Sequence, residues 1–195
     1  MLKEAEEHLL EGIDFADRVN DPGAQSASQI WLGITYLDMG KHVQAREAFE
    51  KGISLLEQHR LLPSILIMGR LNLALAKILC GDTDIELAPL CRDQAANKTK
   101  WLAGDMQRCL SAILLNVDPK RPSEAEDWIK KAIEDDSANG TRFSLAQDFA
   151  QYAELWKVKG KPAMAREKLS KAIEISRECG ADGWVKKYEE ELAGL

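Results

Sequence analysis

A repeat with a period of about 40 residues runs through the chain and restricts its fold more than any other feature. In four copies a small residue is followed four positions later by a large apolar one: Ala5, Ala45, Ala125 and Ala165, then Leu9, Phe49, Ile129 and Leu169. Three positions further stands a small residue with an isoleucine after it: Gly12, Gly52, Ala132 and Ala172, then Ile13, Ile53, Ile133 and Ile173. Steps of four, three and one lie on one face of an α-helix. The period therefore predicts a recurring helix that neighbouring helices approach closely.

A second helix is predicted in front of most copies of this face. It carries Leu32, Gly33 and Tyr36 before Gly40 in one copy, and Tyr152, Ala153 and Trp156 before Gly160 in another. Glycine just past a helix end supplies the left-handed conformation that closes a helix. The copy around Ala112 replaces this glycine with a turn over residues 118–122. No segment alternates as a strand would, so the predicted fold is all-α, a solenoid of α-hairpin repeats.

The residue order resembles the tetratricopeptide repeat, or TPR. The motif is carried by Leu32, Gly33, Tyr36, Gly40, Ala45, Phe49 and Gly52, and again by Tyr152, Ala153, Trp156, Gly160, Ala165, Leu169 and Ala172. The copy around residues 64–97 is degenerate, because Pro89 and Arg92 disturb its second helix. The resemblance implies a right-handed superhelix, with a repeat longer than the usual length of about 34 residues. This longer spacing and the ending at residues 173–184 resemble the C-terminal repeat regions of large bacterial signalling ATPases, nucleotide cyclases and transcription regulators.

The period predicts a single array over residues 1–195. Its parts are a half repeat with only the second helix at 1–20, repeats at 24–60, 63–97, 99–139 and 141–179, and a capping helix at 182–195. Since nothing precedes the half repeat, we expect the chain to be the C-terminal part of a longer protein. The alternative is a natural short protein whose first helix caps the array.

Charge and composition disfavour several classes of protein. With 26 Lys and Arg against 32 Asp and Glu, the net charge is −6, which suits no nucleic-acid partner. The longest apolar stretch, residues 61–68, is too short to cross a membrane, and no signal peptide opens the sequence, so we expect a cytoplasmic protein. The four cysteines form no metal motif and are expected to be reduced, buried thiols: Cys80, Cys91, Cys109 and Cys179.

No catalytic motif is found, and neither a cofactor nor a metal is predicted. The sequence lacks phosphate-binding glycine loops, nucleophile elbows and zinc-binding helices. The acidic pair Asp135 and Asp136 is expected to lie on a solvated surface rather than to act as a general acid and base. The chain is therefore not expected to be an enzyme.

The TPR resemblance implies a concave groove lined by the first helix of each repeat. Its lining residues would be Ile30, Ile34, Leu37, Met68, Leu71, Leu75, Gln107, Leu110, Leu114, Gln147, Glu154 and Lys157. Because the first two repeats place apolar residues there, the family's clamp for terminal carboxylates is disfavoured. The segment from Leu61 to Cys80 is apolar nearly all round, which indicates either burial on more than one side or a docking groove. The occupant of such a groove would be an amphipathic helix, an apolar ligand, or the same segment of a second chain.

The function that these features favour is interaction with another protein or peptide, as the regulatory end of a signalling protein. The alternative is a sensor that holds a peptide or small apolar ligand in the groove. A homodimer through the apolar segment is also consistent with the sequence.

Overall fold

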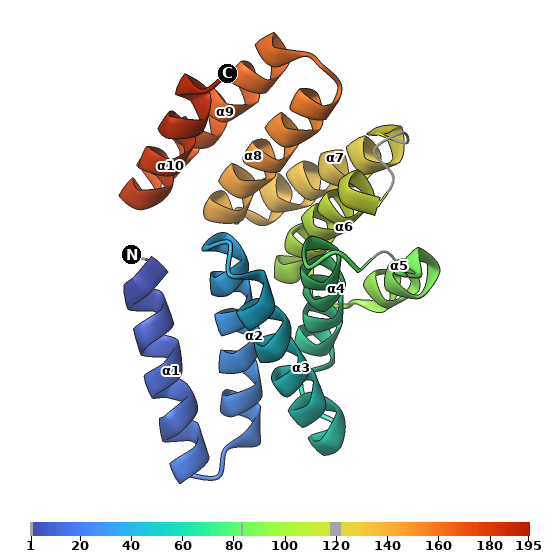
Figure 1. Ribbon diagram of the computed structural model, residues 1–195, viewed down its shortest axis with the longest axis vertical. Helices are drawn as coiled ribbons and strands as arrows, with labels where there is room; N and C mark the ends of the chain where they lie inside the picture. The colour runs from blue at the N-terminus through green and yellow to red at the C-terminus, as the bar shows by residue number, and fades with distance from the viewer. Residues whose placement is uncertain (1, 83, 118–121) are drawn as a thin grey trace. The chain divides into compact units, whose positions relative to one another are not determined.

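The structure is a computed structural model that describes residues 2–82, 84–117 and 122–195 (Figure 1). Its helices are α1 (Leu2–Arg18), α2 (Pro22–Asp38), α3 (His42–His59), α4 (Pro63–Leu79), α5 (Leu87–Ala96), the 3-10 turn η1 (Lys100–Leu102), α6 (Ala103–Val117), α7 (Pro122–Asn139), α8 (Arg142–Val158), α9 (Pro162–Glu178) and α10 (Asp182–Ala193). Among the described residues there is no strand. The prediction of an all-α fold is confirmed.

The spacing of the helices follows the sequence period. Helices α2, α4, α6, α8 and α10 begin at Pro22, Pro63, Ala103, Arg142 and Asp182, so the interval from one to the next is nearly constant. The repeat is thus a property of the structure as well as of the sequence.

Local signals place the helix ends. The carboxylate of Asp21 accepts a hydrogen bond from the backbone N–H of Ala24 at 2.9 Å, and Pro22 occupies the first turn of α2, where its missing N–H costs nothing. Gly40 and Gly160 have φ of +71° and +67°, so both predicted glycines close their helices in the left-handed conformation. The turn predicted at 118–122 lies outside the described residues, except for Pro122, which begins α7.

The chain divides into two compact units, Met1–Lys98 (unit 1) and Thr99–Leu195 (unit 2). The division falls where the third predicted repeat begins. In unit 1, α2 packs against α1 and α3, and α4 packs against α3 and α2 (Figure 1). Helix α5, which contains Pro89 and Arg92, has only ten residues and a small contact with α4. The second repeat therefore lacks a full-length second helix.

Small residues in unit 1 allow close contact between helices, as the sequence pattern predicts. Ile30 is fully buried between Gly52 and Gly69, where an added Cβ would lie 2.8 Å and 2.7 Å from its Cδ1 atom. At Gly33 a Cβ would lie 2.5 Å from the buried ring of Phe49. Any larger residue at these three glycines would force the buried side chain of Ile30 or Phe49 out of its place.

Unit 2 is built from the same kind of hairpins. Helix α8 packs against α7 and α9, α10 packs against α9, and α6 packs against α7 and α8 (Figure 1). Trp184 and Tyr188 bury one face of α10, and the Phe143 ring meets Trp184 edge-on at 5.9 Å. The apolar core continues through the repeat positions Ile129 and Leu169, both fully buried.

Candidate functional site

The predicted groove residues of unit 1 divide into buried and partly exposed members. Ile30, Met68 and Leu71 are buried in the core. Their side chains hold helices together and do not reach a partner. The partly exposed members are Ile34, Leu37 and Leu75. Because α2 and α4 contact each other, these three residues belong to adjoining helices, and we call them the apolar strip.

The predicted groove residues of unit 2 divide in the same way, but the accessible ones are polar. Leu110, Leu114 and Gln107 are buried, and the partly exposed members are Gln147, Glu154 and Lys157. Lys157 pairs with Glu154 at 2.5 Å and with Glu191 of α10 at 3.6 Å.

The structure connects Gln107 and Gln147 to a buried polar cluster that the sequence did not reveal. Its centre is Arg108 on α6. The guanidinium donates to the carboxylates of Asp105 at 2.5 Å and Asp148 at 2.8 Å, and to Oε1 of Gln147 at 3.2 Å.

The second half of this cluster is formed by α7 and the start of α8. Gln107 donates to the carboxylate of Asp135 at 2.8 Å, and the Thr141 hydroxyl donates to Oδ1 of Asp136 at 2.7 Å. The expectation that Asp136 lies on a solvated surface is wrong, because its side chain is fully buried, as is that of Asp148.

Close approach of α6 to α7 encloses Asp136. A Cβ atom added at Gly104 would overlap the carboxylate of Asp136, so this carboxylate lies directly over the backbone of α6. The absence of a side chain at residue 104 therefore makes room for a buried carboxylate on the neighbouring helix.

Burial shifts the acidity of the cluster. Burial, together with the neighbouring Asp136, raises the pKa of Asp148 to about 8, although Arg108 acts in the opposite direction. Burial also raises the pKa of Asp136, and the Thr141 hydrogen bond only partly offsets it. Burial disfavours the charge on Arg108, but the carboxylates of Asp105 and Asp148 outweigh it, so the pKa of Arg108 is raised.

The repeat register contains the signal that would have located these residues. Asp136 stands at the same position of its repeat as Leu56, and a core position at 56 predicts one at 136. Arg108 and Asp148 likewise occupy equivalent positions on successive hairpins, which stack and bring the two side chains together.

A second polar cluster joins α7 to α8. Glu126 accepts hydrogen bonds from the Tyr152 hydroxyl at 3.0 Å and from the ammonium groups of Lys130, at 2.7 Å, and Lys159. Burial works to raise the pKa of Glu126, but these three donors prevail and lower it to about 2. The Trp156 ring stacks on Tyr152 at 5.7 Å.

A related contact occurs three repeats earlier, in unit 1. Glu6 on α1 pairs with Lys41 at 3.0 Å and also accepts a hydrogen bond from Tyr36. The hydrogen bond from Lys41 chiefly lowers the pKa of Glu6. In both units, therefore, a carboxylate near the start of one helix bonds to a cation and to an aromatic residue of the next hairpin.

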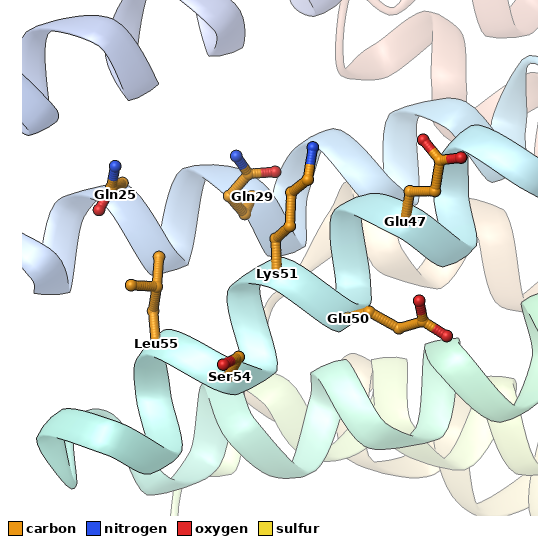
Figure 2. A pocket seen from close by; sticks show the side chains of 7 residues that line it. All are labelled: Gln25, Gln29, Glu47, Glu50, Lys51, Ser54 and Leu55. Atoms are coloured by element: carbon orange, nitrogen blue, oxygen red, sulfur yellow. The ribbon is translucent and has the colours of Figure 1, made fainter.

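An open groove of about 560 Å³ lies on unit 1 between α2 and α3 (Figure 2). Its lining residues are Gln25, Gln29, Glu47, Glu50, Lys51, Ser54 and Leu55. None of the twelve predicted groove residues contributes to it. Its lining residues are polar except for Leu55 and carry both signs of charge, so the groove has no dominant chemistry.

The cysteines only partly match the expectation of buried thiols. Cys109 is buried, and burial raises the pKa of its thiol to about 12. Cys80 and Cys179 are exposed, because each follows the last residue of a helix, at the caps of α4 and α9. Within the described parts of the chain, no three His, Cys, Asp or Glu side chains gather to hold a metal, and no helix has the length and apolarity needed to cross a membrane.

Comparisons with known proteins bear on the fold. No family model matches the chain, and no curated protein matches it in sequence. The crystal structure of BtubC (BKLC) from P. vanneervenii is similar to it with a TM-score of 0.59 and 12% identity, over 99% of this chain and 90% of that chain. A crystal structure of a putative kinesin light chain from Podosopora anserina, with nearly identical TPR-like repeats, has a TM-score of 0.51 and 17% identity, over 92% of this chain and 89% of that one. At these identities the likeness concerns architecture alone, and the chain has the fold of a TPR-like helical repeat array.

Proposed function

We propose that this chain is a non-enzymatic protein-interaction scaffold whose apolar strip binds an amphipathic helix of another protein. The observation that carries the proposal is the partial exposure of Ile34, Leu37 and Leu75 on adjoining helices of unit 1. Apolar side chains that face water on a rigid scaffold gain free energy when a partner covers them. An amphipathic helix presents apolar residues at spacings of three and four, which suits a strip of this kind.

The short helix α5 supports this proposal. Helix α4 is the most apolar helix of the chain, and in a regular array its second helix would cover it over a similar length. Here α5 has ten residues against seventeen in α4, so less of the apolar surface is covered from within unit 1. A partner helix would extend the packing that α5 leaves short.

The wider role is part of the same proposal. The resemblance to C-terminal repeat regions of bacterial signalling proteins supports a regulatory end of a larger cytoplasmic protein. Binding at the array would then alter how it presents or restrains an upstream catalytic or DNA-binding domain.

The proposal is tested by capturing a partner with the purified chain from an extract of its own organism. We expect the double variant Leu37→Ser, Leu75→Ser to lose the partner, because both substitutions remove apolar surface from the strip. The control is Val43→Ser, which makes the same kind of change at an exposed residue of α3 outside the strip. Circular dichroism should show the same helix content for all three proteins. Equal capture by both variants would contradict the proposal.

Native mass spectrometry at two concentrations separates the remaining possibilities. A mass of 21.8 kDa at both concentrations is expected for a scaffold that is free to bind another protein. A dimer lost in the double variant would assign the strip to self-association. Extra mass that disappears on denaturation would make the chain a sensor for a peptide or small apolar ligand.

A further inference from the structure

Between α6, α7 and α8 of unit 2, buried hydrogen-bond acceptors outnumber the donors that reach them. Oε1 of Gln107, Oδ2 of Asp136 and Oδ2 of Asp148 are buried, and no donor among the described residues reaches them. Buried polar atoms in native proteins are nearly always paired, because an unpaired one loses its bonds to water without replacement. These acceptors therefore receive no hydrogen bond from the described side chains around them.

Two of the three acceptors belong to carboxyl groups that face each other. The side chains of Asp136 and Asp148 are within hydrogen-bonding reach of one another. Two ionised carboxylates are both acceptors and repel, whereas a single proton between them gives each oxygen a partner. We propose that Asp136 and Asp148 form a proton-binding site, in which the folded unit 2 holds one proton shared between the two carboxyl groups.

The charges that face the pair make this occupancy favourable. From α6, Arg108 bonds to Asp148 and Asp105. From α7, Asp135 accepts from Gln107. On α8, the first residue, Arg142, pairs with Glu178 of α9.

If both members of the pair were ionised, the cluster would contain three carboxylates, those of Asp105, Asp136 and Asp148. Among the described residues, the one cation bonded within the cluster is Arg108. The shared proton removes one of these negative charges at the place where burial makes it most costly.

The sign of the pH dependence follows from proton binding in the two states. In the unfolded chain both carboxyl groups ionise near their ordinary pKa of about 4. In the folded unit the pKa of Asp148 is raised to about 8 by burial and by Asp136. The folded state therefore binds more protons between these values, so the contribution of this pair to the stability of unit 2 is greatest at the acidic end of the interval and falls as pH rises to about 8.

Few other groups of unit 2 titrate in this interval. The three histidines, His8, His42 and His59, all belong to unit 1. Cys109, which adjoins Arg108, has a pKa of about 12 and stays protonated. A pH response confined to α6–α8 between pH 5 and 8 is thus a specific signature of the pair.

The test is hydrogen exchange of the full chain, followed by mass spectrometry on peptides from α6 to α8 at pH 5 to 8.5, after correction for intrinsic exchange. We compare the wild type with Asp148→Asn, which keeps the shape and the acceptor for Arg108 but cannot ionise. The control is Asp127→Asn, the same change at an exposed position of α7. One proton of difference changes an opening constant tenfold per pH unit, so from pH 5 to 8 the wild type should lose protection relative to Asp148→Asn by at least tenfold and up to about a thousandfold. Asp127→Asn should follow the wild type.

A direct measurement keeps the proposal testable if Asp148→Asn fails to fold. The infrared spectrum of the wild type at pH 6 should contain the carbonyl stretch of a protonated carboxylic acid, and this band should disappear by pH 9. If the band is absent at pH 6, or if the wild type and Asp148→Asn share one pH dependence, no proton is shared and the inference is overturned.

Discussion

Leu56 in unit 1 and Asp136 in unit 2 occupy the same place in the repeat, two copies apart, and both are fully buried. Unit 1 fills the position with an alkyl side chain that needs no partner. Unit 2 fills it with a carboxylate that requires Thr141, the open backbone at Gly104 and, by our inference, a proton shared with Asp148. The comparison shows that the repeat determines which positions are buried, while each unit sets the chemistry found there.

The largest effect is expected when the carboxylate is moved into unit 1. Leu56→Asp places a charge where no donor has been provided, and we expect it to lower the free energy of unfolding of unit 1 at pH 7 by about 4 kcal/mol or more. The control is Leu56→Asn, which loses the same packing without a charge. Urea unfolding followed by circular dichroism at pH 4 and pH 7 measures both variants. The two should differ much more at pH 7 than at pH 4, and an equal loss at both values would show that charge is not what separates the units.

The second largest effect is expected where α6 approaches α7 closely, in unit 2. Gly104→Ala forces a methyl group into the Asp136 carboxylate, and we expect a loss of about 1–3 kcal/mol in the free energy of unfolding. Gly194→Ala, at the open end of α10, should be nearly neutral because its Cβ would have no neighbour closer than 3.6 Å.

The double variant Gly104→Ala, Asp136→Ala should lose less than the two single losses added together, since the second change removes the obstacle to the first. Additive losses would mean that the methyl group strains some other contact. Urea unfolding of the wild type, the two single variants and the double variant provides this double-mutant cycle.

The smallest effect is expected at the two glutamates that bond to the next hairpin, Glu126 in unit 2 and Glu6 in unit 1. Glu126→Gln weakens bonds to Lys130, Lys159 and Tyr152, and we expect a loss of about 1–2 kcal/mol at pH 7. Because the pKa of Glu126 is lowered to about 2, its contribution is present above pH 4.5 and declines as pH falls toward 2.

Glu6→Gln should cost less than Glu126→Gln, because in the described part of the chain Lys41 is the one cation bonded to Glu6, whereas two cations bond to Glu126. Thermal unfolding at pH 7 and pH 2.5 tests the order. The difference between Glu126→Gln and the wild type should shrink at the lower pH, and a difference that persists there would contradict the assignment.

Sequence periodicity predicted the hairpins well, because the small and large residues that face a neighbouring helix recur in four copies at a constant spacing. Ala45, Phe49 and Gly52 were placed on a buried face by spacing alone, and all three are buried. The closing glycines Gly40 and Gly160 were also predictable, since the left-handed conformation is a local requirement. The shortening of α5 was signalled by Pro89.

The polar cluster was harder to predict because its members depend on residues far away in the chain. Asp136 is buried on account of Gly104 on the preceding helix, and spacing on a single helix does not report that. The groove residues were chosen by register, which selects a face of a helix but does not say whether the next hairpin covers it. For this reason Leu71 and Leu110 are buried while Leu75 and Gln147 remain accessible.

The contact between Gly104 and Asp136 also has a consequence for the evolution of the sequence. A lineage that gains a side chain at residue 104 while it keeps the buried carboxylate at 136 loses stability, and one that loses Asp136 no longer needs glycine at 104. Substitutions at the two positions should therefore appear together among homologues, and Arg108 should change together with Asp148, to which it bonds directly. The order in which these four positions changed would record when this array acquired its ionisable core.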